Sequence, residues 1–466
     1  MFIGRDKEMT LLEELYASTK FEFLVLYGRR RVGKTSLLVE FIKKHKAIFF
    51  SAQEKNNALN LQDFSKCVQF YFEGMSFTPF SDWEQAFKYI GGKCGDEKLV
   101  LIIDEFPFVA SEYPAIKSIL QHTIDHSWRD KNITLILCGS SISFMENEIM
   151  GYKSPLYGRS TMQLELKAFD YLESSKFFPY YSLTDRLLSY GILGGIPCYL
   201  ASFDPSKSLK WNIAHNILRT GAFLQNEPQM LLKMELREPN IYNSIFEAIA
   251  FGASRLNDIA TKIHEESYKC SKYVDTLRNL KLIEKKTPCG EKESSKKSIY
   301  VIKDNFYSFW YHFLFPNKTY YELLGEDESS KKIMEGMSDY MGNIFEQICT
   351  EYMVRLARKG QLPFVPKSIG RWWGNNPKKR MQDDIDILCL NGNGSEAIFC
   401  ECKFRNEAFD IKQYEDLFAA AEIFTELEKR YYYIFSKGGF TDAVIKRSEE
   451  DGVELVDVEN LFCIDD

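Results

Sequence analysis

A glycine-rich stretch near the start of the sequence, YGRRRVGKTS at residues 27–36, carries side chains that are suited to binding phosphate. Gly28 and Gly33 bracket four residues. Lys34 and Thr35 follow them, so the stretch fits the pattern G-x-x-x-x-G-K-[ST] without a gap. The glycines let successive backbone N–H groups face an anion, the lysine reaches the outer phosphates, and the threonine hydroxyl can ligate Mg²⁺. The stretch therefore predicts a loop that binds a nucleoside triphosphate together with Mg²⁺. We expect this nucleotide to be ATP.

The residues on either side of this stretch predict a strand before it and a helix after it. Residues 23–27 (FLVLY) are short, β-prone and closed by glycine, which is typical of a strand buried on both faces of a parallel sheet. Residues 36–45 (SLLVEFIKKH) repeat apolar side chains at helical spacing, so the positive end of a helix faces the phosphates. The arginines could instead lie on the outer surface of the loop or face another domain. The residues expected at the nucleotide are Gly28, Arg29, Arg30, Arg31, Val32, Gly33, Lys34, Thr35 and Ser36.

Two further apolar runs end in polar side chains. The run LVLIIDE at residues 99–105 ends in two acids, which belong at the carboxyl end of a parallel strand, where open α/β sheets bind ligands. Asp104 is predicted to coordinate the metal directly or through water, and Glu105 to orient or deprotonate the attacking water. The run ITLILCGSS ends in Ser140 and Ser141. Ser140 could sense the γ-phosphate, or the two serines could cap the next helix.

The composition is that of an ordinary globular protein and limits the classes of partner. The 466 residues should divide into roughly three domains, and fractions of 45% hydrophobic and 27% charged residues are usual. The net charge of −7 means that any contact with nucleic acid must come from local basic patches. No apolar run is long enough to cross a bilayer, and the charged N-terminus does not resemble a signal peptide. We expect a cytoplasmic protein with no membrane partner and with its eleven cysteines reduced.

The order of the motifs in the first half of the chain resembles the archaeal-type ATPases of the STAND branch of P-loop ATPases, which are related to AAA+ proteins. The resemblance implies a parallel-sheet ATPase core followed by a helical lid, with ATP and Mg²⁺ as ligands. Beside the phosphate loop and the two strand ends, it rests on FIGRDKEMTLL at 2–12, SPLYGRS at 154–160 and GGIPCYL at 194–200.

The resemblance also implies roles for residues outside the loop. Gly4 and Arg5 would lie near the nucleotide base, and Pro197 would pack there from the helical lid. Arg159 would be a charge sensor near the γ-phosphate, a role that suits a guanidinium because it can stabilise the charge of a phosphoryl-transfer transition state. The alternative is a surface arginine that follows a turn glycine.

Residues 241–303 predict three amphipathic helices and a β-hairpin, which is the winged-helix arrangement. The third helix offers Lys269, Lys272 and Arg278, and the hairpin adds more lysines. This local basic surface makes contact with DNA conceivable. We favour the alternative that the module packs within the molecule and communicates the nucleotide state. The hairpin lysines are Lys285, Lys286, Lys292, Lys296 and Lys297.

The C-terminal part holds a second group of chemically useful residues. Residues 381–404 (MQDDIDILCLNGNGSEAIFCECKF) predict a strand, an Asn-Gly-rich turn and a second strand. Because side chains alternate along a strand, Glu401 and Lys403 share one face, beside Asp386 of the paired strand. The upstream segment GNIFEQICTEYMVRLA predicts a helix that carries Glu346.

This arrangement resembles the core of the PD-(D/E)XK nucleases and a C-terminal domain of uncharacterised function that accompanies this type of ATPase. It implies that Asp386, Glu401 and Glu346 hold a metal ion. Lys403 would position or activate a hydrolytic water against a phosphodiester. The usual proline before the first acid is missing, and Asp384 competes with Asp386 for the metal role.

We therefore expect an α/β protein with four regions. They are a P-loop ATPase core (1–165), a helical lid (166–238), a winged helix (239–320) and a restriction-endonuclease-like domain (335–466). The expected function is Mg²⁺-dependent ATP hydrolysis. We expect this hydrolysis to control the winged helix and the nuclease-like domain, which would act on DNA. The alternative is a nucleotide-gated signalling switch of the STAND type that binds an unknown protein partner and cuts nothing.

Overall fold

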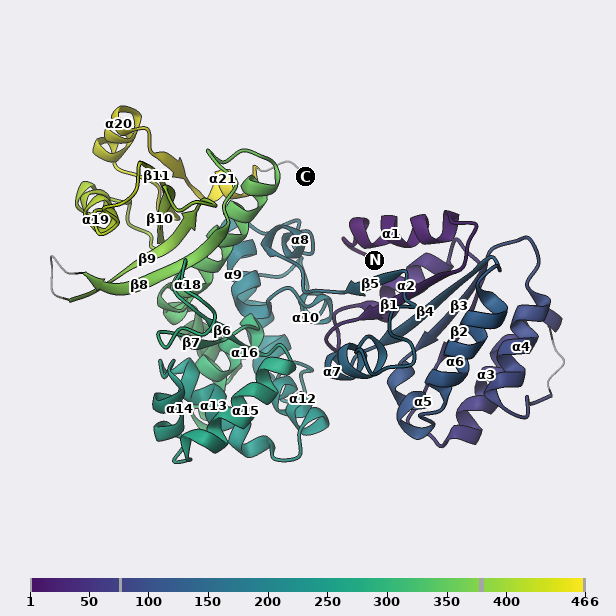
Figure 1. Ribbon diagram of the computed structural model, residues 1–466. Helices are drawn as coiled ribbons and strands as arrows, with labels where there is room; N and C mark the ends of the chain where they lie inside the picture. The colour runs from purple at the N-terminus through teal and green to yellow at the C-terminus, as the bar shows by residue number, and fades with distance from the viewer. Residues whose placement is uncertain (1, 75–77, 377–380, 464–466) are drawn as a thin grey trace. The chain divides into compact units, whose positions relative to one another are not determined.

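The computed structural model describes residues 2–74, 78–376 and 381–463, which form two compact units (Figure 1). The first unit comprises Met1–Ala168 with Ile196–Cys198, and the second comprises Phe169–Gly195 with Tyr199–Asp466. No helix among the described residues is both long enough and apolar enough to cross a membrane.

The first unit is built on a five-stranded parallel sheet with the order β2-β3-β4-β1-β5. Every residue of β3 and β4 is buried, which is typical of strands in a parallel sheet that is covered on both faces. The strand predictions over residues 23–27, 99–105 and 133–141 are confirmed by β1, β3 and β4. Since β4 pairs with both β1 and β3, the carboxyl ends of these three strands lie at one edge of the sheet. The strands are β1 (Glu22–Tyr27), β2 (Ala47–Ser51), β3 (Leu99–Asp104), β4 (Ile133–Gly139) and β5 (Met162–Glu165).

Helices cover both faces of this sheet (Figure 1). The face that carries Phe23, Leu101 and Leu135 packs against α3 to α6 in one apolar core, which includes Phe64 and Trp83. The helices are α1 (Asp6–Ala17), α2 (Lys34–Ile42), α3 (Asn57–Glu73), α4 (Trp83–Lys93), α5 (Phe106–Glu112), α6 (Ile116–Thr123) with its π-helical extension η1 (Ile124–Trp128), and α7 (Ile142–Phe144) with η2 (Met145–Ile149).

The second unit begins with helices and a small hairpin. Three helices and an antiparallel pair of strands occur in the order that the sequence predicts for residues 241–303. The elements are α8 (Tyr171–Ser175), α9 (Leu183–Leu193), α10 (Pro197–Leu200, shared with the first unit), α11 (Leu209–Asn212), η3 (Ile213–Leu218), α12 (Glu227–Glu235), α13 (Pro239–Ala250), α14 (Leu256–Lys262), α15 (Ser267–Asn279), β6 (Ile283–Lys286), β7 (Ile299–Ile302), α16 (Asn305–Phe309), η4 (Trp310–Leu314) and α17 (Lys318–Leu324).

A 33-residue helix, α18 (Glu326–Arg358), leads into a second five-stranded sheet with the order β12-β11-β10-β9-β8. The strands β8, β9 and β10 are antiparallel neighbours, whereas β10, β11 and β12 run parallel. The predicted hairpin over residues 381–404 forms β9 and β10, and β8 is an additional strand that the sequence analysis does not predict. The elements are β8 (Ser368–Asn376), β9 (Met381–Leu390), β10 (Glu396–Lys403), α19 (Ile411–Ala421), β11 (Lys429–Ser436), α20 (Asp442–Asp451), β12 (Glu454–Val456) and α21 (Val458–Phe462).

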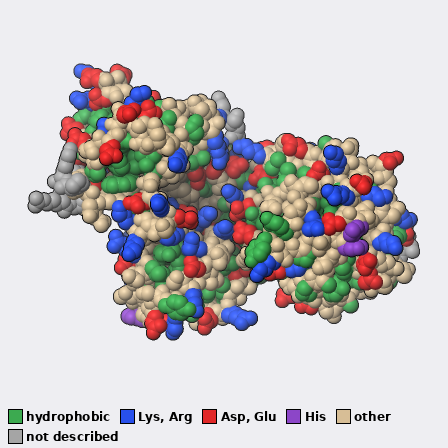
Figure 2. Space-filling model, viewed as in Figure 1, with side chains coloured by type: hydrophobic (Ala, Val, Ile, Leu, Met, Phe, Trp, Pro, Cys, Tyr) green, Lys and Arg blue, Asp and Glu red, His purple; other side chains and the backbone are tan. Residues whose placement is uncertain are grey.

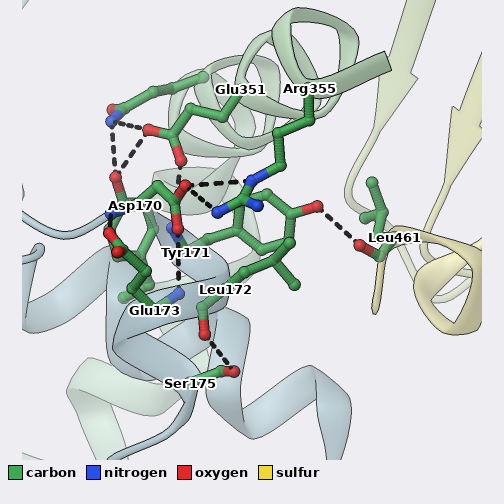
Figure 3. Close-up of polar contacts among 10 residues, drawn as sticks. Asp170, Tyr171, Leu172, Glu173, Ser175, Glu351, Arg355 and Leu461 are labelled. Carbon is green, nitrogen blue, oxygen red and sulfur yellow. Dashed lines mark hydrogen bonds and ion pairs between the residues drawn. The ribbon is translucent and has the colours of Figure 1, made fainter. Parts of the chain in front are cut away.

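A group of polar contacts joins α18 to the helices at the start of this unit (Figure 3). The guanidinium of Arg355 is paired with Asp170, the N-cap of α8, with Nε 3.1 Å from Oδ2. The carboxylate of Glu351 accepts hydrogen bonds from the Tyr190 hydroxyl (2.7 Å) and from the backbone N–H of Tyr171 (3.1 Å). The Tyr171 hydroxyl in turn donates to the carbonyl of Leu461 in α21 (2.6 Å). Residues 170–190 are therefore fastened to the helix that enters the C-terminal sheet.

The Glu351 carboxyl should make the stability of the fold depend on pH. Loss of hydration raises the pKa of Glu351 to about 7, from 4.5 for an ordinary glutamate. Between these two values the unfolded chain loses the proton while the folded chain keeps it, so this group makes the fold less stable as the pH rises from 4.5 to 7. We expect Glu351→Gln to flatten this part of the profile of Tm against pH.

The matched control is Glu449→Gln, at an exposed position of α20, which should leave the slope of the wild type unchanged. If Glu351→Gln and the wild type have parallel profiles between pH 4.5 and 7, Glu351 does not carry the assigned proton.

Candidate nucleotide and acidic sites

The phosphate loop positions a buried ammonium group. Lys34 begins α2, and its Nζ donates to the carbonyls of Gly28 (2.8 Å) and Arg29 (3.0 Å). Burial lowers the pKa of Lys34, although the neighbouring Glu105 and Asp104 oppose that shift. The ammonium is therefore held by carbonyls of its own loop, which the oxygens of a phosphate can replace.

The loop backbone is tightly constrained around this ammonium. A Cβ atom on Gly28 would lie 2.4 Å from the carbonyl oxygen of Leu166, so only glycine fits there. Gly33 has φ +95°, and Arg31 has φ +68°, an uncommon conformation for a residue with a side chain. Arg29, Arg30 and Arg31 are half-buried, Val32 is buried, and Thr35 and Ser36 are exposed.

The ends of the neighbouring strands converge on the loop. The Thr35 hydroxyl donates to Asp104 Oδ2 (2.8 Å), so the two predicted Mg²⁺ ligands are in contact. Asp104 is buried, and its other oxygen accepts from the backbone N–H of Glu105 (3.0 Å). Ser140 donates its hydroxyl to the Glu105 carboxylate, and its backbone N–H lies 3.3 Å from the same group. The Ser140 side chain thus contacts Glu105, and its role at the γ-phosphate stays a prediction. The side chain of the N-cap Ser141 makes no capping hydrogen bond to α7.

Two of the more distant predicted residues also lie against the loop. Arg5 is buried, and its Nη2 donates to the carbonyls of Val32 (3.0 Å) and Lys167 (2.7 Å). Arg5 and the preceding Gly4 both have φ +69°, so the chain turns sharply there before α1. A Cβ atom on Gly33 would lie 3.7 Å from Cγ of Pro197, which places the proline next to the loop.

Arg159 forms an ion pair that the sequence does not predict. Its Nη2 lies 2.7 Å from Asp125 Oδ2, and its Nε lies 3.0 Å from Oδ1 of the same carboxylate. Nη1 donates to the carbonyl of Pro155 (2.9 Å). The Arg159 contact lowers the pKa of Asp125. A role for Arg159 at the γ-phosphate requires the guanidinium to leave this ion pair.

The C-terminal acids gather around the end of β10. Lys403 is ion-paired with Glu401, and the backbone N–H of Cys402 donates to Asp386 Oδ2 (2.8 Å). Burial and the charge of Asp386 together raise the pKa of Glu401 to about 7, and the same two causes raise the pKa of Glu346 to about 8. The four predicted residues thus share one electrostatic environment. Asp384, the competitor of Asp386, is exposed.

Arg371 of β8 is a charged member of this group that the sequence analysis did not identify. Its Nη1 lies 3.4 Å from Glu346 Oε2, and its Nη2 contacts the carboxylate of Asp384. Burial tends to lower the pKa of Lys403, but the carboxylates of Glu401 and Asp386 outweigh that effect and raise it. Arg371 and Lys403 therefore offset part of the negative charge of these acids.

These acids offer the right donor atoms for Mg²⁺ without forming a complete cage. Within the described ranges, no three His, Cys, Asp or Glu side chains are arranged to hold a metal ion. Carboxylate oxygens are nevertheless the ligands that Mg²⁺ prefers, and Mg²⁺ usually takes one or two carboxylates and completes its shell with water and substrate phosphate. At the C-terminal group, Asp386 and Glu401 could supply these one or two protein ligands. At the phosphate loop, Thr35 and Asp104 could supply them.

Comparison with known proteins assigns the first half of the chain. An uncharacterised protein of Methanocaldococcus jannaschii, MJECL04, is 34% identical over 445 residues, which cover 94% of this chain and 96% of that protein. An ATPase domain found predominantly in archaea matches residues 2–203, and a family of archaeal and bacterial proteins of unknown function matches residues 310–415. The chain belongs to the archaeal ATPase family. The resemblance that the motifs imply is therefore confirmed for a P-loop ATPase.

Two shorter or more distant likenesses agree with this assignment. The uncharacterised ATP-binding protein MJ0423 of Methanocaldococcus jannaschii is 44% identical over 46 residues, which are 10% of this ATPase and 78% of that protein. The Walker-type ATPase PABY2304 of Pyrococcus abyssi has a TM-score of 0.50 at 19% identity, over 66% of this chain and 96% of that chain, which is a likeness of fold.

Lys34 should dominate nucleotide affinity in this ATPase. We expect Lys34→Ala to weaken binding of ATP by roughly 100-fold or more, because the phosphates lose a buried charged donor. Titration with a fluorescent ATP analogue measures this change. The control is Lys43→Ala at the end of the same helix, where an exposed lysine pairs with Glu40. Unchanged affinity of Lys34→Ala would refute the assignment of the phosphate loop.

Arg159 should affect ATP turnover more than ATP affinity. We expect Arg159→Ala to lower turnover by about 100-fold or more if its guanidinium stabilises the transition state. Asp125→Ala removes the same ion pair but keeps the guanidinium, so it should retain most of the turnover. Steady-state kinetics on both variants separate the two roles, and equal losses in the two variants would assign Arg159 a structural role only.

Proposed function

We propose that ATP hydrolysis in the first unit controls a metal-dependent hydrolytic site in the second unit that acts on the phosphodiester backbone of DNA. The observation that carries the proposal is the meeting of Asp386, Glu401 and Lys403 on adjacent strands with Glu346 of α18. The order of elements, a helix, three antiparallel strands, a helix and a parallel strand, supports a PD-(D/E)XK-like fold for residues 335–466.

The residues have distinct roles under this proposal. Asp386 and Glu401 would hold Mg²⁺, which supplies a Lewis acid and lowers the pKa of a bound water. Lys403 holds the Glu401 carboxylate in its present orientation and offers N–H donors to a water or a phosphate oxygen. Glu346 faces the same group of charges from the helix side.

The residues of the ATPase site also have separate roles under this proposal. Gly28 to Ser36 would hold the phosphates, with Lys34 on the outer ones, while Thr35 and Asp104 would hold Mg²⁺. Glu105 would orient the attacking water once it exchanges the Ser140 hydroxyl for that water. Gly4, Arg5 and Pro197 would border the nucleotide base.

We propose a structural role for the winged-helix region, residues 239–320, in preference to DNA binding. Its cations have acidic neighbours: Lys269 lies 3.7 Å from Glu265, and Arg278 lies 2.9 Å from Asp275. On the face shown in Figure 2, acidic and basic side chains are interspersed and form no single basic field. DNA contact would then come from the nuclease-like region.

Lys403→Ala tests the hydrolytic site directly. We expect the wild type to cleave single- or double-stranded DNA with Mg²⁺ or Mn²⁺ in an ATP-dependent way, and Lys403→Ala to lose cleavage while keeping its ATPase activity. Gel analysis of end-labelled DNA measures cleavage, and release of phosphate from ATP measures the ATPase activity. The matched control is Lys429→Ala, which removes a lysine paired with Glu396 (3.3 Å) in the same sheet and should leave cleavage unchanged.

A nucleotide-gated switch without nuclease activity is the second candidate. It is favoured by the contact of Arg371 with Glu346, which fills one side of the acidic group with a protein cation. Very slow ATP turnover with tightly retained nucleotide, and no cleavage of DNA under any condition, would support the switch and an unknown protein partner over the nuclease.

A further inference from the structure

The β6–β7 hairpin, residues 283–302, is seated on the C-terminal sheet. The backbone N–H of Cys289 donates to the carbonyl of Arg371 in β8 (2.9 Å). The indole N–H of Trp373 donates to the carbonyl of Lys297 at the other side of the hairpin loop (3.1 Å). The hairpin loop therefore contacts β8 at two points, while β6 and β7 themselves form a separate two-stranded sheet.

The hairpin loop packs against the sheet's apolar core just after β6, at Cys289 and Gly290. The Cys289 side chain is 8% exposed, belongs to the same core as Ile385 and Leu388, and its thiol lies 3.0 Å from the Leu388 carbonyl. Gly290 has φ +84°, and a Cβ atom there would lie 2.9 Å from a methyl group of Leu390. A larger residue at Gly290 would therefore be strained by the positive φ and would have to displace the Leu390 side chain.

The hairpin meets β8 at an interruption of the sheet. Gly370 pairs with Leu388 and Trp372 pairs with Ile385, so two residues of β9 lie opposite Arg371 alone. A β-bulge of this kind re-aims side chains and leaves the ladder locally unpaired. One of the two bulged residues is Asp386, and the Cys289 N–H binds the carbonyl of Arg371 at this same point.

The Arg371 side chain contacts the acidic group directly. Its guanidinium bridges Glu346 on α18 and Asp384 on β9, with Nη1 3.4 Å from Glu346 Oε2. The charge of Lys286, on β6 of the hairpin, also acts on Glu346 and favours its ionised form. The hairpin thus fixes the backbone of one cation and supplies a second.

We propose that Arg371 is a positioning residue that holds Glu346 toward Asp386. The β6–β7 hairpin binds the backbone of Arg371 and thereby determines where Arg371 and Glu346 lie in the acidic site. When the hairpin leaves β8, Arg371 loses its backbone anchor, and Glu346 loses its counter-charge. The link to cleavage rests on the proposed nuclease function, whereas the mechanical link from hairpin to Arg371 to Glu346 does not.

Gly290→Val tests the seat of the hairpin. The added side chain is strained at this φ and competes with Leu390 for space, so this part of the loop should leave the core and expose Cys289. The control is Gly252→Val, at a glycine with φ +89° and no atom within 4 Å of its Cβ position, which shares the backbone strain without the clash. Alkylation by a maleimide, followed by mass spectrometry, measures exposure, with the exposed Cys198 and Cys463 as internal references. We expect Cys289 labelling to approach that of the references in Gly290→Val only.

A double-mutant cycle tests the role of Arg371 without any enzyme assay. We expect Arg371→Gln to lower Tm, because the Glu346 carboxyl loses the guanidinium that it contacts. The same change in a Glu346→Gln background should cost less than half as much, whereas Arg371→Gln and Lys429→Ala should be additive. Arg371→Lys, which keeps the charge, should recover part of the loss.

Four outcomes decide the matter. Additive losses for Arg371→Gln and Glu346→Gln would overturn the positioning role, and equal Cys289 labelling in Gly290→Val and Gly252→Val would overturn the anchor. If wild-type DNA cleavage is found, Arg371→Gln and Gly290→Val should lower kcat with little change in KM, and a change confined to KM would overturn the link to cleavage. Absence of cleavage in the wild type, with coupling retained in the cycle, refutes the nuclease function and supports the mechanical link.

Discussion

The attachment of α18 to α8 and α9 is the constraint on which the second unit depends. The ion pair of Arg355 with Asp170, and the Glu351 carboxylate bound by Tyr190 and Tyr171, hold the segment that follows the ATPase core on this helix. Glu346 lies on the same helix, little more than one turn before Glu351. A movement of α8 and α9 would therefore be carried along a rigid helix to the acidic group. No separate relay is required, because the two ends of the path belong to one element.

In the phosphate loop and at the neighbouring strand ends, each reactive group is bound by another group of the protein. Lys34 is held by the carbonyls of Gly28 and Arg29, and the Thr35 hydroxyl is held by Asp104. Glu105 is likewise bound by Ser140. ATP and Mg²⁺ would have to replace these contacts together, which links occupation of the loop to the positions of two neighbouring strand ends. Such exchanges give a ligand different interactions in two states, which is what a change of conformation requires.

The sequence predicted the buried strands and their polar ends well, and the long-range contacts poorly, for physical reasons. β1, β3 and β4 are buried on both faces and therefore appear as unbroken apolar runs ending at Gly28, Asp104 and Ser140. In contrast, eight of the nine residues of β8 are not buried, so SIGRWWGNN lacks the alternation that marks a strand, and Arg371 was missed with it. The pairing of Arg159 with Asp125, and of Arg355 with Asp170 across 185 positions, depends on tertiary structure that no local pattern encodes.

Hydrogen–deuterium exchange of the full chain, with and without ATP and Mg²⁺, tests most directly whether the nucleotide state reaches the acidic group. The informative peptides are those of α18 and β8, compared with α20, which lies elsewhere in the same unit. The account predicts that ATP changes exchange in α18 and β8 in the wild type, and that the change is absent in Lys34→Ala. Exchange that changes only in the first unit, with α18 and β8 unaffected by ATP, would contradict it.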